Sequence, residues 1–147
     1  MKKPKILGFY GESKSGKTTL ITKLIKHLSA DGLNVATVKI TDKNIELDSK
    51  GRDTWKHSEA GSNLVVLSSA IETDYLVKKK QTINDIIENI SNIGHFDIII
   101  VEGANHKETP KIRLGKIKQR VNTVFTYDGD FEKLLKFVKN QIKYGVF

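Results

Sequence analysis

The residues best suited to chemistry form one loop at positions 11–18, which is rich in glycine, serine and lysine. This loop matches the pattern G-x-x-x-x-G-K-[ST] without a substitution, which is the pattern of a loop that cradles nucleotide phosphates. The apolar segment 6–10 before it predicts a buried strand. Apolar residues at helical spacing follow it: Leu20, Ile21, Leu24, Ile25 and Leu28. A strand, a loop and a helix N-terminus together present backbone N–H groups and a positive helix dipole, which suits a polyphosphate.

Each position of this phosphate-binding loop (P-loop) has an expected role. Gly11 and Gly16 allow close approach of the backbone. Lys17 is expected to reach the β- and γ-phosphates, and the Thr18 hydroxyl to bind Mg²⁺. Lys14 either adds a second positive charge or points into solvent. The full set of expected nucleotide contacts is Gly11, Glu12, Ser13, Lys14, Ser15, Gly16, Lys17, Thr18 and Thr19.

A second candidate group is the carboxylate of Glu102. It follows the isoleucine-rich segment 96–101, whose lack of alternation predicts a central parallel strand covered on both faces. Open α/β sheets bind their ligands at the carboxyl ends of strands. We therefore expect Glu102 to hold Mg²⁺ or to position a water. The alternative is an ordinary surface acid at a strand end.

A polar loop after the predicted strand 34–40 supplies a third group of candidates. Its position resembles a switch region, where a carboxylate can complete the Mg²⁺ shell or orient a water. The candidates are Asp42, Glu46, Asp48 and Asp53. A merely solvated loop is the alternative for each of them.

The remaining segments alternate between strand and helix patterns. Helices are expected over 16–32, 53–60, 82–94 and from a cap at Asp130, and strands over 64–67, 75–77 and 121–125. Thr82 and Asp85 form a near capping box. No linker interrupts the chain. The sequence therefore predicts one nucleotide-binding domain over 1–147, with the three-layer α/β P-loop NTPase fold and a mainly parallel central sheet.

Composition restricts the partners. The formal net charge of +8 favours an anionic partner, and nucleotide phosphates suffice. The lysines are not interleaved with aromatic residues, which makes nucleic acid the less favoured partner. There are no cysteines, so disulfides and thiolate metal sites are excluded. No apolar run approaches the roughly 20 residues of a membrane span, and we expect a cytoplasmic protein without a membrane partner or signal peptide.

Two further runs resemble a known family. The run from Val38 to Trp55, ending in 59–62, is similar to a signature of MobB, the molybdopterin-guanine dinucleotide biosynthesis adaptor proteins. Residues 101–103 followed by 109–112 resemble a later motif of that family. With the P-loop, the resemblance covers nearly the whole chain through about residue 113.

The resemblance implies a GTP-binding protein with weak Mg²⁺-dependent GTPase activity that forms a homodimer. It implies a molybdenum cofactor guanylyltransferase and molybdopterin as partners. The matching positions are Glu46 and Asp48, the triplet Gly51, Arg52 and Asp53, and the strand-end Glu102. On this basis the catalytic candidates are Lys17, Asp48 and Asp53, and the metal candidates are Thr18 and Glu102. No Asn-Lys-x-Asp motif for guanine is present, so the choice of GTP over ATP rests on the resemblance alone.

The sequence also departs from the family. Ile40, Asp42 and Lys43 stand where members commonly have a histidine cluster. A basic run follows the later motif and predicts either a docking surface for a pterin phosphate or acidic partner, or a solvated face: Lys111, Arg113, Lys116, Lys118 and Arg120. The sequence leaves two other functions as alternatives. A small-molecule or nucleotide kinase would need an arginine-rich lid, and a nucleic-acid-binding module would use the basic tail.

Overall fold

The computed structural model describes residues 3–145, which divide into two compact units. The first unit runs to Thr41 and resumes at Ile87, and the second covers Asp42–Ile86. The expectation of one nucleotide-binding domain over 1–147 stays a prediction. None of the helices within the described residues is long and apolar enough to cross a membrane.

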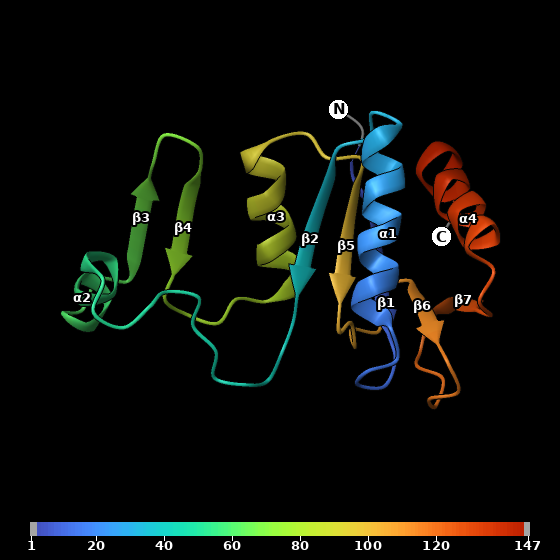
Figure 1. Ribbon diagram of the computed structural model, residues 1–147, viewed down its shortest axis with the longest axis horizontal. Helices are drawn as coiled ribbons and strands as arrows, with labels where there is room; N and C mark the ends of the chain where they lie inside the picture. The colour runs from blue at the N-terminus through green and yellow to red at the C-terminus, as the bar shows by residue number, and fades with distance from the viewer. Residues whose placement is uncertain (1–2, 146–147) are drawn as a thin grey trace. The chain divides into compact units, whose positions relative to one another are not determined.

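The first unit contains a five-stranded sheet in which every neighbouring pair of strands is parallel (Figure 1). The predicted α/β fold with a mainly parallel central sheet is therefore confirmed. The strand order is β2-β5-β1-β6-β7, with the following bounds: β1 Lys5–Tyr10, β2 Val35–Lys39, β5 Ile98–Glu102, β6 Lys111–Leu114 and β7 Thr123–Tyr127. β5 lies inside the sheet, between β2 and β1, and is buried, as its unbroken isoleucine run predicted. β6 was not predicted.

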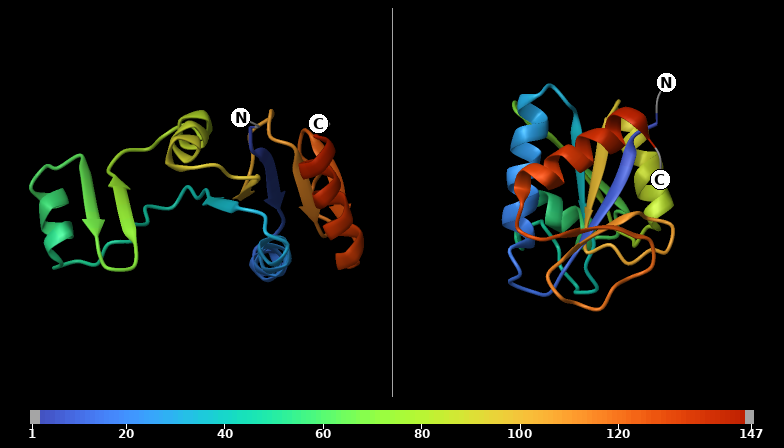
Figure 2. Two further views of the ribbon diagram at one scale, coloured as in Figure 1. Left: turned by 90° about the horizontal axis from the view of Figure 1, so that it is seen from above. Right: turned by 90° about the vertical axis from the view of Figure 1, so that its right-hand side faces the viewer.

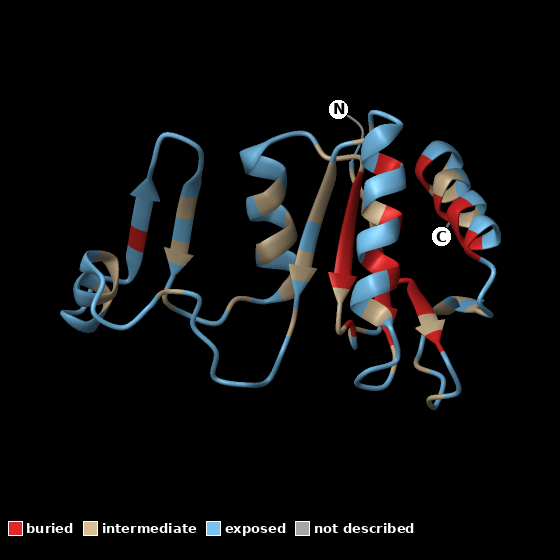
Figure 3. Ribbon diagram, viewed as in Figure 1, coloured by how far each residue is buried: buried red, intermediate tan, exposed pale blue. Residues whose placement is uncertain are grey.

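Two helices, α1 (Lys17–Ala30) and α4 (Phe131–Tyr144), cover one face of this sheet (Figure 2). Figure 3 shows the buried positions gathered on these helices and the strands behind them. The apolar faces predicted for both helices are the ones that enter the core. The Asp130 side chain accepts a hydrogen bond from the Lys133 backbone N–H at 3.2 Å, which confirms the predicted cap.

The other face of β1 is covered by the segment 103–110, which crosses from β5 to β6 on either side of β1. The crossing needs a residue without a side chain at Gly8. A Cβ there would collide with the Cβ of Ala104 and lie 3.3 Å from Cγ2 of Thr109. Gly8 therefore lets an irregular segment pass directly over the central strand.

The second unit contains α2 (Asp53–Glu59) and an antiparallel hairpin of β3 (Leu64–Ser68) and β4 (Thr73–Val77). Both strands were predicted, but their separation into a sheet of their own was not. α2 packs against β3, and Val65 is buried. On the opposite face of the hairpin four apolar side chains are exposed: Leu64, Val66, Tyr75 and Val77.

α3 (Ile83–Ile93) spans the boundary between the two units. Its isoleucines were predicted to form a buried face. They are instead half-buried, and Ile93 is 72% exposed. The helical spacing identified which face is apolar, but it carried no information on how deeply that face is covered.

Candidate functional site

The P-loop (residues 11–18) connects β1 to the first turn of α1. The Ser15 N–H donates to the Glu12 carbonyl at 3.1 Å, which closes a turn within it. Lys14 and Gly16 both have left-handed backbone conformations, with φ of 62° and 84°. Gly11 has no room for a side chain, because a Cβ would lie 2.9 Å from Ser15 Oγ and 3.0 Å from Leu114 Cβ. The loop therefore depends on glycine at both ends.

Lys17 and Thr18 are the first residues of α1, where the N-terminal N–H groups favour anions. Lys17 is half-buried, whereas Thr18 is exposed. The Thr18 Oγ1 donates a hydrogen bond to Glu102 Oε1 at 3.2 Å. The structure thus brings together the two residues that the sequence nominated as metal ligands.

A hydroxyl and a carboxylate oxygen are hard ligands of the kind that Mg²⁺ prefers, so the Thr18–Glu102 pair fits this ion. Residues 3–145 contain no cluster of three or more His, Asp or Glu side chains that could hold a metal by itself. A magnesium ion at Thr18 and Glu102 would accordingly take its other ligands from phosphate oxygens and water, as is usual for this ion.

Backbone hydrogen bonds join the end of β5 to the chain at the end of β2 and to β1. The Glu102 carbonyl accepts from the Ile40 N–H, and the Gly103 N–H donates to the Phe9 carbonyl, both at 3.0 Å. Gly103 has a φ of 84°, and a Cβ there would lie 2.6 Å from the Ile40 carbonyl oxygen. The backbone on both sides of the Glu102 carboxylate is therefore held by β1 and β2.

The acidic candidates of the polar loop belong to the second unit. Glu46 forms an ion pair with Lys78 at 3.0 Å. Asp48 Oδ1 accepts from the Ser49 N–H at 3.0 Å, while its Oδ2 is buried without a hydrogen-bond partner among the described residues. Asp53 is exposed in the first turn of α2. The catalytic roles of Asp48 and Asp53 stay predictions.

Three members of the basic run make internal contacts, and for the buried Lys111 neither expected interpretation holds. Lys111 is fully buried in β6, and its Nζ donates to three carbonyl oxygens, those of His106, Thr109 and Val121. Burial, and secondarily the charge of Arg120, lowers the pKa of Lys111 below its usual 10.5.

The two arginines of the run act similarly. Arg113 Nε donates to the Ile117 carbonyl and Arg120 Nη1 to the Ala104 carbonyl, each at 2.7 Å. Lys116 and Lys118 alone remain exposed. The alternation of Ile112 and Leu114 with basic residues is a strand pattern that could have revealed β6. The carbonyl partners of Lys111 could not be predicted, because every residue has a backbone carbonyl group.

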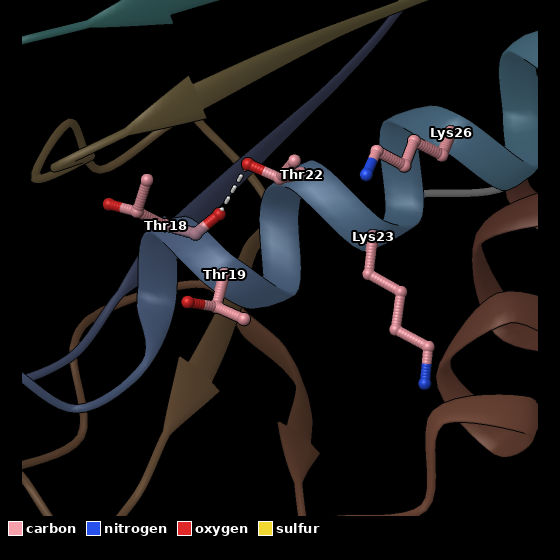
Figure 4. Close-up of a pocket in the computed structure, with 5 residues that line it drawn as sticks. All are labelled: Thr18, Thr19, Thr22, Lys23 and Lys26. Atoms are coloured by element: carbon pink, nitrogen blue, oxygen red, sulfur yellow. Dashed lines mark hydrogen bonds between the residues drawn. The ribbon is translucent and has the colours of Figure 1, made fainter.

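A shallow cavity of about 310 Å³ lies along α1 and begins at the P-loop (Figure 4). Its lining residues are Thr18, Thr19, Thr22, Lys23 and Lys26. The Thr22 hydroxyl donates to the Thr18 carbonyl at 2.8 Å. Sequence reasoning named the first two residues but not the other three, because exposed lysines and threonines on a helix carry no distinguishing signal.

Comparison with known proteins identifies the family. Residues 6–140 match the family model of MobB, molybdopterin guanine dinucleotide synthesis protein B. The molybdopterin-guanine dinucleotide biosynthesis adapter protein of Haemophilus influenzae is 34% identical over 110 residues, covering 74% of this chain and 62% of the relative. The Escherichia coli protein of that name is 30% identical over 113 residues, covering 74% of this chain and 64% of the relative.

The fold agrees with this match. The crystal structure of Bacillus subtilis MobB superimposes with a TM-score of 0.76 at 21% identity, covering 93% of this chain and 97% of that one. This chain spans less than two thirds of the length of the two curated relatives. Because the family model covers nearly all of its length, the chain belongs to the MobB family.

Proposed function

We propose that this protein is an adapter in the formation of molybdopterin guanine dinucleotide that binds GTP with Mg²⁺ and hydrolyses it slowly. The observation that carries the proposal is the hydrogen bond between Thr18 and Glu102 beside the P-loop, in a member of the MobB family. The names of the curated relatives support the pathway.

The residues have distinct parts in this proposal. The backbone of Gly11, Glu12, Ser13, Lys14, Ser15, Gly16, Lys17, Thr18 and Thr19 surrounds the phosphates. The Lys17 ammonium neutralises the outer phosphates, and Thr18 and Glu102 hold Mg²⁺. The ion supplies positive charge to the phosphate oxygens when it is bound. Asp48 and Asp53 complete the metal shell or orient a water.

The internal contacts of two arginines support slow turnover. Arg113 and Arg120, two of the three arginines of the chain, each donate to a carbonyl oxygen within the protein, so both guanidinium groups already have an internal partner. An arginine supplied by a partner is worth about 10³–10⁵ in rate for related hydrolases. The same contacts argue against a kinase, whose arginine-rich lid would need these side chains.

Calorimetric titration with GTP and ATP, each with Mg²⁺ and with EDTA, tests nucleotide binding. We expect GTP to bind more tightly with Mg²⁺, and Lys17→Ala to weaken binding at least about tenfold, since a hydrogen-bonded charge is lost. Lys136→Ala, which removes an exposed positive charge from α4, is the control and should bind as wild type does. Absence of Mg²⁺-dependent binding by the wild-type protein refutes the nucleotide site, and a preference for ATP refutes the choice of base.

The proposed partners are a molybdenum cofactor guanylyltransferase and molybdopterin, encountered in the cytoplasm. The test is co-purification with that enzyme, followed by assay of dinucleotide formation with and without this chain. Faster formation with the wild-type protein than with Lys17→Ala is the expected result. Equal rates for wild type and for no addition would remove the adapter role.

A homodimer completes the proposal. The hairpin of the second unit has the buried Val65 on one face and the exposed side chains of Leu64, Val66, Tyr75 and Val77 on the other. A two-stranded hairpin is marginally stable by itself and needs a second layer on its apolar face. A second copy provides an identical, self-complementary layer about a twofold axis.

A further inference from the structure

The crossing segment 103–110, which follows Glu102, has no helix or strand of its own. Buried carbonyl groups must find donors, and in an irregular segment the backbone cannot supply all of them. Here side chains from β6 and from the segment before β7 donate to four of its carbonyls: Arg120 to Ala104, Lys111 to His106 and Thr109, and Asn122 to Glu108. Two residues of the run that predicted either a docking surface or a solvated face, Lys111 and Arg120, thus hold the crossing segment in place.

Arg120 also contacts Tyr10, which the other two donors, Lys111 and Asn122, do not. Its guanidinium lies over the ring of Tyr10, 4.7 Å from the centroid, and its backbone N–H donates to the Tyr10 hydroxyl at 3.0 Å. That hydroxyl also hydrogen-bonds to Thr123 Oγ1 at 2.7 Å. Tyr10 is fully buried and immediately precedes Gly11 of the P-loop. Its ring is therefore held in one position at the entrance to the loop.

One side chain thus joins the two segments that supply the Thr18–Glu102 pair. Through Tyr10 it contacts the strand that leads into the P-loop, and through the Ala104 carbonyl it contacts the backbone two residues beyond Glu102. We propose that Arg120 is a positioning residue that keeps the Glu102 carboxylate within reach of the Thr18 hydroxyl, and that it thereby sets the Mg²⁺ dependence of nucleotide binding. This inference rests on the proposed function.

The chemistry of the side chain suits this role. A guanidinium can stack its face on an aromatic ring while it donates in its own plane to a carbonyl oxygen. An ammonium is a point charge on a flexible stem and cannot make both contacts with the same fixed geometry. Arg120→Lys should therefore retain the charge but lose the positioning.

The experiment compares GTP affinity with Mg²⁺ and with EDTA by calorimetry for wild type, Arg120→Ala and Arg120→Lys, each with and without Glu102→Gln. Loss of a residue that orients a metal ligand costs about 10- to 100-fold in metal affinity. We expect Arg120→Ala and Arg120→Lys to reduce the enhancement by Mg²⁺ at least about tenfold, with EDTA affinity little changed. In the Glu102→Gln background the same substitutions should have no further effect, because Arg120 acts through that carboxylate. Lys118→Ala removes an exposed charge from the same segment and should match wild type.

Hydrogen–deuterium exchange of the nucleotide-free protein provides a second readout. The Gly103 N–H, which donates to Phe9, should exchange faster in Arg120→Ala than in wild type or Lys118→Ala. Unchanged exchange at Gly103 overturns the proposal, as does an equal loss of affinity with and without Glu102→Gln, which would indicate a general structural role. If wild type itself shows no enhancement by Mg²⁺, the proposed function fails and this inference fails with it. If wild type shows the enhancement and Arg120→Ala keeps it, only this inference fails.

Discussion

Thr18 Oγ1 and Glu102 Oε1 lie 3.2 Å apart although 84 positions separate the two residues in the chain. The strand order explains this proximity. β5 pairs with β1 in parallel, and the register sets Glu102 beside Phe9, two residues before the P-loop begins. Parallel neighbours end at the same edge of a sheet, so the last residue of β5 meets the loop that follows β1.

The Thr18 hydroxyl is the first contact to test. Thr18→Val keeps the shape of the side chain but removes the hydroxyl, and Thr18→Ser keeps the hydroxyl. We expect Thr18→Val to reduce the enhancement of GTP affinity by Mg²⁺ at least about tenfold, since the substitution removes a hydroxyl that contacts a charged group. Thr18→Ser should stay close to wild type. Calorimetry with Mg²⁺ and with EDTA measures both, and equal Mg²⁺ enhancement in the two variants would exclude Thr18 from the metal site.

The passage of the crossing segment over β1 gives a prediction on stability. In Gly8→Ala the added methyl group meets the Cβ of Ala104, and overpacking of this kind costs about 1–3 kcal/mol. Adding Ala104→Gly removes the colliding atom. The double variant should therefore be more stable than Gly8→Ala alone, with a coupling of at least about 1 kcal/mol in a double-mutant cycle.

Urea unfolding of the wild type, both single variants and the double variant provides the four free energies. The remaining neighbour of the new methyl group, Thr109 Cγ2 at 3.3 Å, belongs to a side chain that can shift slightly. Additive effects of the two substitutions would show that the segment does not rest on Gly8 as described.

Much of this fold could be predicted because the relevant signals are local. The P-loop pattern, the apolar stripe of α1, the unbroken isoleucines of β5 and the cap of α4 at Asp130 each depend on residues close together in the chain. The pairing of Thr18 with Glu102 followed from a general rule about strand ends. That rule applies to parallel sheets in general, so no knowledge of particular side-chain contacts was needed.

The missed features depend on distant partners. Lys111 in β6 can be buried because the carbonyl oxygens of three other residues accept hydrogen bonds from its ammonium. A lysine in a sequence is ordinarily evidence for an exposed position. The exposed hairpin face is a similar case. The apolar residues of β3 and β4 predicted strands, but only the tertiary structure shows that the two strands pair with each other and do not join the five-stranded sheet.

The capping box of α3 makes the stability of that helix end pH-dependent. Hydrogen bonds from Thr82 to the Asp85 carboxylate hold the pKa of Asp85 below its usual 3.8. The hydroxyl of Thr82 has the larger effect and its backbone N–H the smaller one. A carboxyl whose pKa is lowered on folding stabilises the folded state above its unfolded pKa. That contribution is lost as the pH falls through the lowered value.

Thr82→Ala removes the hydroxyl and leaves the backbone donor. The pKa of Asp85 should therefore rise toward 3.8 without reaching it, and the pH window over which the stabilisation is lost should narrow. Titration of the Asp85 carboxyl carbon by NMR measures the pKa directly. Thr82→Ser retains a hydroxyl and should keep the wild-type value, and a Thr82→Ala titration that coincides with wild type would contradict the assigned cause.

The hairpin offers a matched pair of substitutions for the proposed homodimer. Val66 and Leu67 are neighbours in β3 with similar exposure, 46% and 41%, but their side chains point to opposite faces. Val66 lies opposite Tyr75 on the apolar face, whereas Leu67 lies opposite Asp74 on the face of the buried Val65. A carboxylate introduced at Val66 would be buried without a partner in both copies of a twofold interface. Val66→Asp should therefore weaken the dimer roughly 100-fold, and Leu67→Asp should leave it intact. Light scattering across a dilution series measures the dissociation, and a dimer that survives Val66→Asp would place the contact between copies elsewhere on the chain.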